Sequence, residues 1–325
     1  MDFLTLIGFF VVLYLFVYLI VLSISDCDLG LLWAERFGEK LDTFKGKVVW
    51  ITGASSGIGE HLAIVLAKHG AKLILSARSE ENLLRVQQRC IAEAQAYQGD
   101  IAILPLDVTD FSKHEQCFQK AIHQFGKLDI LVNNAGRSQR AVWEDIDVEV
   151  DKQLFTLNVF GAVALARKAI RHFNDQGSGH LVVTSSLAGV IPAPFSASYT
   201  GSKFALHGYF NCLRNEKLGS NLAITLLCPG PVFSNFLNEA FTNTPGEKFG
   251  QKVSATDRRM SAERCATLSA IAIANKLDEV WMALFPVLHF TYIVVNWPYL
   301  TSKIMKLIGP QLFQKMRDSK QTVQN

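Results

Sequence analysis

Short apolar segments that alternate with helical stretches are the feature that most restricts how this chain can fold. The apolar segments lie at 48–52, 72–76, 101–104, 128–132, 182–186, 223–227 and 279–282. Most are apolar along their whole length, which is typical of strands buried on both faces. The stretches between them predict helices at 60–69, 80–96, 112–125 and 154–173, and a further helix around position 199. The alternation predicts an α/β fold: a Rossmann-type, doubly wound parallel sheet in a single domain.

Composition narrows the class of protein. The chain has 325 residues, a hydrophobic content of 49% and a formal charge of +3, without a basic run that is interleaved with aromatic residues. This composition supplies an ample core and gives no sign of a nucleic-acid partner. The six cysteines are scattered and form no C-x-x-C pair. We therefore expect no metal site and no disulfide framework, but mostly buried, reduced thiols.

The N-terminal run 3–22 is apolar and uncharged. Twenty helical residues span about 30 Å, the thickness of a bilayer core. A signal peptide cleaved after Ser25, which would give a secreted soluble enzyme, is the alternative. The run is longer than the usual signal core and Asp2 replaces a basic leader, so a retained transmembrane helix is favoured. Arg36 and Lys40 follow the span, which favours a cytoplasmic body.

The C-terminal region contains a second apolar stretch, 284–300, that is interrupted by Pro286, His289, Asn296 and Pro298. It fits a segment that lies on a membrane or packs in a dimer better than a second span. The tail 303–320 is basic and amphipathic, and it suits either a headgroup surface or plain solvent.

A glycine-rich segment, 52–59, separates the first predicted strand from the first helix. Its candidate binding residues are Gly53, Ser55, Ser56, Gly57, Ile58 and Gly59. Glycines allow the backbone to approach a pyrophosphate closely, and a helix N-terminus offers free N–H groups and a positive dipole end. An ordinary tight turn is the alternative.

Tyr199 and Lys203 are four residues apart, so a helix places them on one face. A nearby ammonium favours the phenolate and lowers the tyrosine pKa from about 10. The pair can then serve as an acid/base, and Ser186 follows a predicted strand 13 residues upstream. Taken alone, such a pair is more often an ordinary pair on a helical surface.

Five motifs occur together in one order: Thr-Gly-x-x-x-Gly-x-Gly, Asn133-Asn134-Ala135-Gly136, Asn158, Ser186 and Tyr199-x-x-x-Lys203. With this set, residues 47–281 resemble the classical short-chain dehydrogenases/reductases. The N-terminal span and the segments 31–35, 48–50 and 228–232 are similar to the membrane-bound member-7 subgroup of that family.

The resemblance implies a catalytic set. Tyr199 would be the acid/base, and Lys203 would lower its pKa and hold the nicotinamide ribose. Ser186 would bind the substrate oxygen, and Asn158 would position a water of the proton relay. From the residues alone, an asparagine in a helical zone is usually a surface or kink residue.

The resemblance also implies cofactor contacts. Asn134 would steady the adenosine wall, Asp107 would contact adenine, and Ser234 would replace the usual threonine at the carboxamide. A lone aspartate is more often a helix cap. At the end of the second strand, where NAD enzymes carry an acid, this chain has Ala77 followed by Arg78. A guanidinium suits a 2′-phosphate, so NADP(H) is the expected cofactor, although Arg78 is also compatible with a solvated helix start.

The resemblance implies an NADP(H)-dependent oxidoreductase for lipophilic carbonyls and alcohols, such as steroids, retinoids or xenobiotics. It further implies attachment to the endoplasmic reticulum membrane and a homodimer. The aromatic residues of 233–260 would line the substrate pocket or pack a covering segment. The expected division is 1–22 membrane anchor, 23–46 connector, 47–283 NADP-binding catalytic domain and 284–325 C-terminal extension. A non-catalytic scaffold that binds nucleotide is the alternative function.

Overall fold

The computed structural model describes residues 2–95, 98–254 and 256–318, and it contains one parallel sheet in the order β3-β2-β1-β4-β5-β6-β7. The strands are β1 Val48–Thr52, β2 Lys72–Ser76, β3 Ile101–Ile103, β4 Ile130–Asn133, β5 Gly179–Thr184, β6 Leu222–Pro229 and β7 Glu279–Met282. Every neighbouring pair is parallel. The predicted fold class is confirmed.

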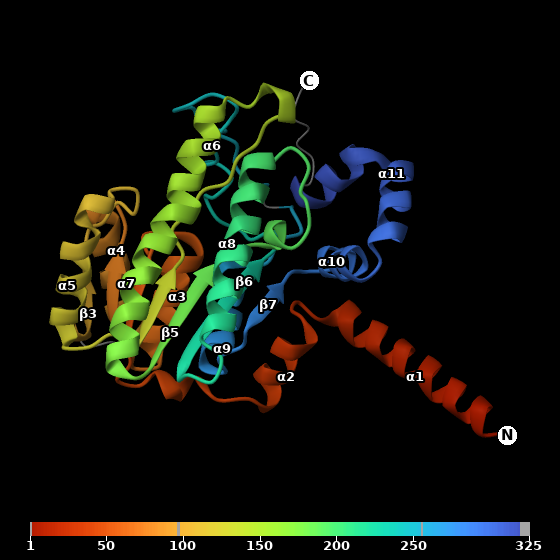
Figure 1. Ribbon diagram of the computed structural model, residues 1–325, viewed down its shortest axis with the longest axis horizontal. Helices are drawn as coiled ribbons and strands as arrows, with labels where there is room; N and C mark the ends of the chain where they lie inside the picture. Colours follow the sequence, from red (N-terminus) through yellow and green to blue (C-terminus); the bar gives the residue numbers. More distant parts are fainter. Residues whose placement is uncertain (1, 96–97, 255, 319–325) are drawn as a thin grey trace.

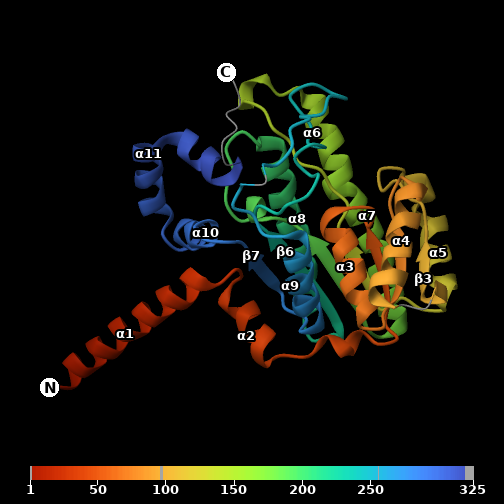
Figure 2. The same ribbon diagram turned by 180° about the vertical axis from the view of Figure 1, so that it is seen from behind.

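Helices cover both faces of the sheet because alternate strand residues enter two separate cores (Figures 1 and 2). On β1, Val49 and Ile51 face a core shared with α3 Gly57–Lys68, α4 Glu80–Ala94 and α9 Ala262–Ala274. Val48 and Trp50 face the opposite core, shared with α5 His114–Phe125, α7 Gly161–Gln176 and α8 Ala197–Glu216. All five β1 residues are buried, so a continuous apolar run is what this strand requires.

The strand order reverses between β1 and β4. The chain runs outward from β1 through β2 to β3, and then returns to place β4 on the other side of β1. In open α/β sheets, ligands bind beyond the carboxyl ends of the strands at such a switch point. The glycine-rich segment after β1 and the Asn133-Asn134 segment at the end of β4 therefore meet at one edge.

The N-terminal helix α1, Phe3–Ile24, extends away from the rest of the molecule (Figure 1). Asp2 accepts a hydrogen bond of 2.8 Å from the Thr5 N–H and so caps it. Within the described residues it is the one helix long and apolar enough to cross a membrane. It ends two residues beyond the predicted run.

The segment 23–46, expected to be a connector, contains an ordered helix, α2 Leu29–Phe37. The Asp28 carboxylate accepts from the Leu31 N–H at 3.0 Å and from the Trp281 N–H at 2.7 Å. Leu31 is fully buried, in the core that contains α9. The Asp28 carboxylate thus caps α2 and fixes it to β7. The mixed charge of the segment does not predict this contact.

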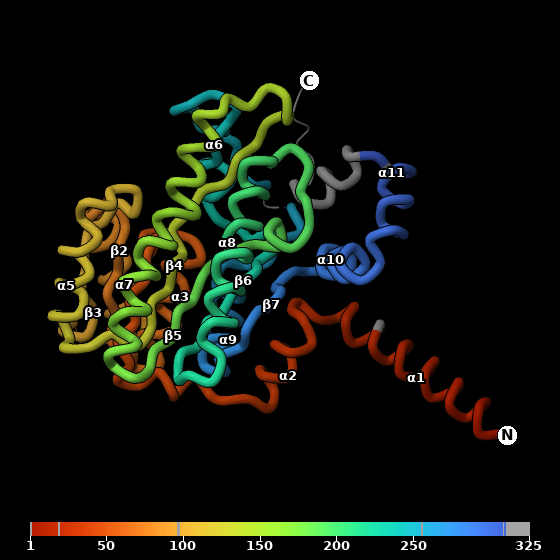
Figure 3. Tube along the Cα trace, in the orientation of Figure 1, coloured from red at the N-terminus to blue at the C-terminus, as the bar shows by residue number. Residues whose placement is uncertain are grey.

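The C-terminal region forms α10 Val287–Asn296 and α11 Pro298–Asp318, with a break at Gly309. Figure 3 shows α1, α2 and α10 at the β7 edge of the sheet. Tyr292 of α10 contacts Trp281, with ring centroids 5.0 Å apart, and Tyr18 of α1 at 6.4 Å. The interrupted apolar stretch therefore forms α10, which packs against the base of α1, and the first turn of α11. Positions 319–320 of the predicted basic tail lie outside the described residues.

Candidate active site

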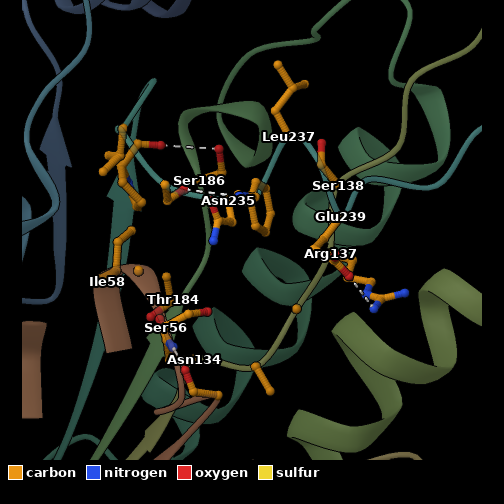
Figure 4. A pocket seen from close by; sticks show the side chains of 18 of the residues that line it. Ser56, Ile58, Asn134, Arg137, Ser138, Thr184, Ser186, Asn235, Leu237 and Glu239 are labelled. Carbon is orange, nitrogen blue, oxygen red and sulfur yellow. Dashed lines mark hydrogen bonds and ion pairs between the residues drawn. The ribbon is translucent and has the colours of Figure 1, made fainter. Parts of the chain in front are cut away.

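A cavity of about 1210 Å³ opens at the carboxyl ends of the strands (Figure 4). Its wall contains most of the predicted site residues: Gly53, Ser55, Ser56, Gly57, Ile58, Arg78, Asp107, Asn134, Ser186, Tyr199, Lys203 and Ser234. Gly59 and Asn158 are not part of the described wall and lie behind it. The structure thus brings together residues that are up to 181 positions apart in the sequence.

The glycine-rich loop is packed backbone against backbone. Gly53 and Gly57 have φ values of +65° and +58°, in the left-handed region that glycine tolerates best. A Cβ on Gly59 would lie 2.4 Å from the Gly53 carbonyl oxygen and 2.6 Å from Asn134 Nδ2. The Ser56 side chain makes no capping hydrogen bond to α3 within the described structure. The loop therefore brings backbone N–H groups to the cavity without a side chain to cap them.

Asn134 ties the loop to the end of β4. Its Nδ2 group donates to the Thr52 and Gly53 carbonyl oxygens, at 3.2 and 3.1 Å. In return, Thr52 Oγ1 accepts from the Asn134 and Ala135 N–H groups, at 3.0 and 3.2 Å. The expected steadying role of this amide corresponds to these contacts. The hydroxyl of Thr52 is a partner that the sequence interpretation missed.

A buried carboxylate at the start of α3, which also lines the cavity, braces the same loop. Glu60 accepts from Arg85, at 2.6 and 2.8 Å, and from Arg89. Arg85 also donates to the Ser55 carbonyl oxygen at 2.9 Å. Burial alone would raise the pKa of Glu60, but the hydrogen bonds from the two guanidinium groups outweigh it and lower the pKa. Glu60 is therefore a charged anchor at the start of α3, although it carries no motif signal.

Arg78 and Asp107 lie on the cavity wall with different partners. The Arg78 side chain is exposed and has no hydrogen-bond or ion-pair partner among the described residues. Asp107 accepts from the N–H and the hydroxyl of Thr109, at 2.9 and 2.7 Å. One carboxylate oxygen of Asp107 therefore closes a local turn instead of capping a helix, since the next helical segment, Phe111–Lys113, begins after Asp110.

The helix α8 presents Tyr199 and Lys203 to the cavity, as their spacing predicts. Lys203 is 4% exposed, donates to the Thr184 carbonyl oxygen at 2.8 Å, and lies 5.7 Å from the Tyr199 ring centroid. Burial lowers the pKa of Lys203 to about 8. Tyr199 is 8% exposed, and its ring meets Phe236 edge-on, with centroids 5.8 Å apart. Both groups are therefore held by packing rather than free on a surface.

Ser186 lies on the cavity wall, whereas Asn158 lies behind it. Ser186 follows β5, and its hydroxyl donates to the Pro229 carbonyl oxygen at 3.2 Å. Asn158 lies in a π-helical turn, Thr156–Phe160, between α6 Val148–Phe155 and α7. Its amide accepts from the Arg137 N–H and donates to the Arg137 carbonyl oxygen, each at 2.9 Å, and donates to Ser202 at 3.0 Å. It therefore holds the backbone behind the cavity.

The segment 230–260 covers the other end of the cavity. Phe233, Phe236 and Leu237 line the wall, whereas Phe241 lies 5.3 Å from the Arg137 guanidinium. Phe233 and Phe236 therefore line the cavity, which is the first alternative for these aromatics. Phe241 packs the covering segment against Arg137, which is the second. Glu239 joins the segment to the body by accepting from Arg137 at 2.9 Å, a contact drawn in Figure 4.

Known proteins are similar to this chain in sequence or in fold. The family model described as short chain dehydrogenase matches residues 47–245. The mouse protein "Dehydrogenase/reductase SDR family member 7" is 40% identical over 298 residues, covering 91% of this chain and 88% of that protein. A short chain dehydrogenase/reductase from Burkholderia phymatum, in complex with NAD, has a TM-score of 0.65 and 25% identity, covering 82% of this chain and 97% of that one. An alcohol dehydrogenase from Thermococcus sibiricus, complexed with 5-hydroxy-NADP, has a TM-score of 0.64 at 23% identity, covering 74% of this chain and 97% of that one.

Proposed function

The chain belongs to the short chain dehydrogenase family of oxidoreductases, and from this premise we propose that it interconverts lipophilic carbonyls and alcohols with NADP(H). The observation that carries the proposal is the convergence of Tyr199, Lys203 and Ser186 on one wall of the cavity. These three residues come from α8 and from the segment that follows β5, and their side chains are packed rather than solvated.

Each side chain has one task in the reduction. The Tyr199 hydroxyl gives its proton to the carbonyl oxygen, while the Ser186 hydroxyl holds that oxygen in place. The buried Lys203 ammonium favours the tyrosine anion that remains after the transfer. Asn158 keeps the Arg137 backbone in place behind the site, at 2.9 Å. In the oxidation of an alcohol the same groups act in reverse.

The residues at the glycine-rich end fit a dinucleotide. Among the described residues, no side chain caps the N-terminus of α3 and none pairs with Arg78; the helix end suits a pyrophosphate, and the guanidinium suits a 2′-phosphate. Ser55, Ile58, Asn134, Asp107 and Ser234 complete the proposed binding set. When bound, the cofactor supplies hydride to the carbonyl carbon. Arg78 and the absence of an acid at Ala77 are what favour NADP(H) over NAD(H).

The other end of the cavity supports a lipophilic substrate. Its wall includes Ile191, Phe236, Leu237, Val287 and Phe290. Such a surface favours the apolar part of a substrate, while Ser186 binds the oxygen of its carbonyl or hydroxyl group. Steroids, retinoids and xenobiotic carbonyls are the proposed classes.

We further propose that α1 anchors the protein in the endoplasmic reticulum membrane with its catalytic domain, 47–283, outside the bilayer. The support is the length and apolar surface of Phe3–Ile24. The intact chain should stay in the membrane pellet after a carbonate wash, and deletion of residues 1–22 should release at least part of it. An intact chain that washes off would contradict the anchor. If the truncated protein stayed fully in the pellet, the C-terminal helices would be sufficient to anchor it. The alternative role of these helices is packing in a homodimer.

Substitution of the proposed acid tests the function. Removing a positioned general acid typically costs about 10²–10⁴ in rate. Tyr199→Phe should lose that much kcat with lipophilic ketones, yet keep its fold and NADPH affinity, because only the hydroxyl is lost. Lys203→Ala should lower both turnover and cofactor affinity. A Tyr199→Phe enzyme with near-normal turnover would contradict the mechanism and favour the rival function, a scaffold that binds nucleotide.

A further inference from the structure

A chain of polar contacts lies behind the cavity wall, next to Lys203. It is centred on His207, one helical turn after Lys203 on α8. His207 Nε2 lies 3.0 Å from Ser185 Oγ, and His207 Nδ1 lies 3.3 Å from Glu279 Oε2. The side chain of His207 is 13% exposed and that of Glu279 is 27% exposed. The contacts therefore run from β5 under α8 to β7 at the edge of the sheet.

The partners of His207 set the direction of each hydrogen bond. Glu279 also accepts from Trp281 Nε1, at 2.7 Å. Burial alone would raise the pKa of Glu279, but hydrogen bonds from His207 and Trp281 outweigh it and lower the pKa. An ionised carboxylate only accepts, so His207 Nδ1 carries a proton and donates to it. In the neutral ring, Nε2 is then the acceptor for the Ser185 hydroxyl.

A second group approaches the same nitrogen. Cys228 Sγ lies 3.7 Å from His207 Nε2. Burial raises the pKa of the Cys228 thiol well above its ordinary value, so it stays a weak donor beside Ser185 rather than a competing anion. The polar side chains in contact with His207, within the described part of the chain, are therefore Ser185, Cys228 and Glu279, from three adjacent strands or strand ends.

Two consecutive turns of α8 hold the last residue of β5 and the residue that follows it. Lys203 donates to the Thr184 carbonyl oxygen at 2.8 Å, and His207 holds the Ser185 hydroxyl. The next residue is Ser186. The following turn packs so closely that a Cβ on Gly189 would lie 2.7 Å from Ser185 Oγ and 2.9 Å from His207 Nε2. The backbone that carries Ser186 is therefore fixed from the residue just before it.

We propose that His207 is a positioning residue that acts through Ser185 to aim the Ser186 hydroxyl at the substrate oxygen. This inference rests on the proposed function, in which Ser186 binds that oxygen. Glu279 fixes the tautomer and orientation of His207. His207 in turn holds Ser185, and Ser185 fixes the backbone of the next residue, Ser186.

The simpler alternative is that His207 is a buried histidine that only stabilises the fold. His180 offers a matched control. It lies near the start of β5, the strand that leads to Ser185; it is 5% exposed and its side chain lies 2.8 Å from Thr225 Oγ1. It is another buried histidine bonded to a hydroxyl group, at the end of the strand away from the cavity. His180→Leu should lower thermal stability while leaving kcat unchanged.

A double-mutant cycle with Ser186 separates the two roles. Misplacing a reacting group by about 1 Å can cost up to about a hundredfold, so His207→Leu should lower kcat by about ten- to a hundredfold. NADPH affinity, measured by fluorescence titration, should stay within about twofold. In a Ser186→Ala background, His207→Leu should cost less than about twofold, because the group it positions is gone. An equal loss of kcat in both backgrounds would overturn the proposal.

Two further variants keep the test decisive if His207→Leu does not fold. Ser185→Ala removes the same hydrogen bond from the other side, so it should reproduce the kcat loss and the same coupling to Ser186→Ala. His207→Gln should recover kcat to within about fivefold of the native protein, because its Oε1 can accept from Ser185. A Ser185→Ala protein with native kcat would overturn the proposal.

A spectroscopic readout does not depend on turnover. Histidine ¹⁵N spectra of the full chain, with His207 assigned by its absence in His207→Gln, should show the Nδ1–H tautomer at neutral pH. The Nε2–H tautomer would overturn the positioning proposal even if the enzyme is active. Absence of any turnover by the native protein would instead overturn the proposed function, and this spectrum would still decide how His207 is bonded.

Discussion

The two ends of the cavity that we propose to bind the nucleotide and the substrate, the nucleotide end and the substrate end, are built from different kinds of contact. At the nucleotide end, the backbone packs on the backbone: Gly59 lies against the Gly53 carbonyl group, and Asn134 and Thr52 exchange hydrogen bonds between β1 and β4. These contacts leave no room for larger side chains. They present a surface whose shape is fixed before any ligand arrives.

The substrate end depends on isolated contacts between side chains and short bridges. The segment 230–260 contains no helix or strand among its described residues. Single bridges join Val232 to Met260 and Gln139 to Phe241, and Glu239 pairs with Arg137 and Lys248. A substitution here changes one contact rather than a whole surface. We infer that backbone geometry fixes the shape of the proposed dinucleotide surface, on which Arg78 selects the form of the cofactor, whereas side chains that can vary specify the substrate.

The largest effect is expected where the backbone packs most closely. Gly59→Ala would place a Cβ 2.4 Å from the Gly53 carbonyl oxygen. Overpacking typically costs about 1–3 kcal/mol, so NADPH and NADH should both bind up to about a hundredfold more weakly. Gly208→Ala on α8 is the matched control, because a Cβ there has no neighbour within 4 Å. Unchanged affinity for both cofactors in the Gly59 variant would remove the distinction between the two ends.

An effect of no greater size, and confined to one of the two cofactors, is expected at Arg78. A hydrogen bond to a charged group contributes about 1.5–3 kcal/mol, or roughly ten- to a hundredfold in affinity. Arg78→Ala should lose that much affinity for NADPH and almost none for NADH, since only NADPH carries the 2′-phosphate. Equal losses for both cofactors, measured by titration, would contradict the assigned role of this side chain.

The smallest effect is expected at the substrate end. The Arg137–Glu239 pair is partly exposed, with side chains 16% and 36% accessible, so solvent screens it. Such pairs contribute about 0.2–1 kcal/mol. Glu239→Gln should therefore change KM for a lipophilic ketone by about two- to fivefold and leave NADPH affinity nearly unaltered. Lys248→Gln, which removes only the second partner of Glu239, should have less effect. A large loss of cofactor affinity would show that the two ends are not independent.

The nucleotide end could be predicted from the sequence because its physical demands select particular residue types. Only glycine suits the close approach at Gly59, and the spacing of Tyr199 and Lys203 follows directly from the helical repeat. Continuous apolar runs likewise identified the strands. His207 extends the spacing of Tyr199 and Lys203 by one more turn, so the same periodicity could have revealed it.

The remainder depends on long-range partners that leave no local pattern. Asp28 caps α2 and also binds the Trp281 backbone, which is why an apparent connector is ordered. The π-helical turn that places Asn158 adds a residue to a helix without changing its composition. The role of Glu239, an ion pair with Arg137, could not be predicted because the two residues are far apart in the sequence.

The most direct test of the central claim is turnover by the purified full-length protein. Lipophilic ketones and alcohols should be supplied with NADPH, NADP⁺, NADH and NAD⁺ in parallel, with product formation followed by mass spectrometry. We expect ketone reduction or alcohol oxidation that is coupled to the NADP pair and is at least about tenfold less efficient with the NAD pair. Tight cofactor binding without any turnover across the panel would contradict the claim, and equal efficiency with both pairs would contradict its cofactor assignment.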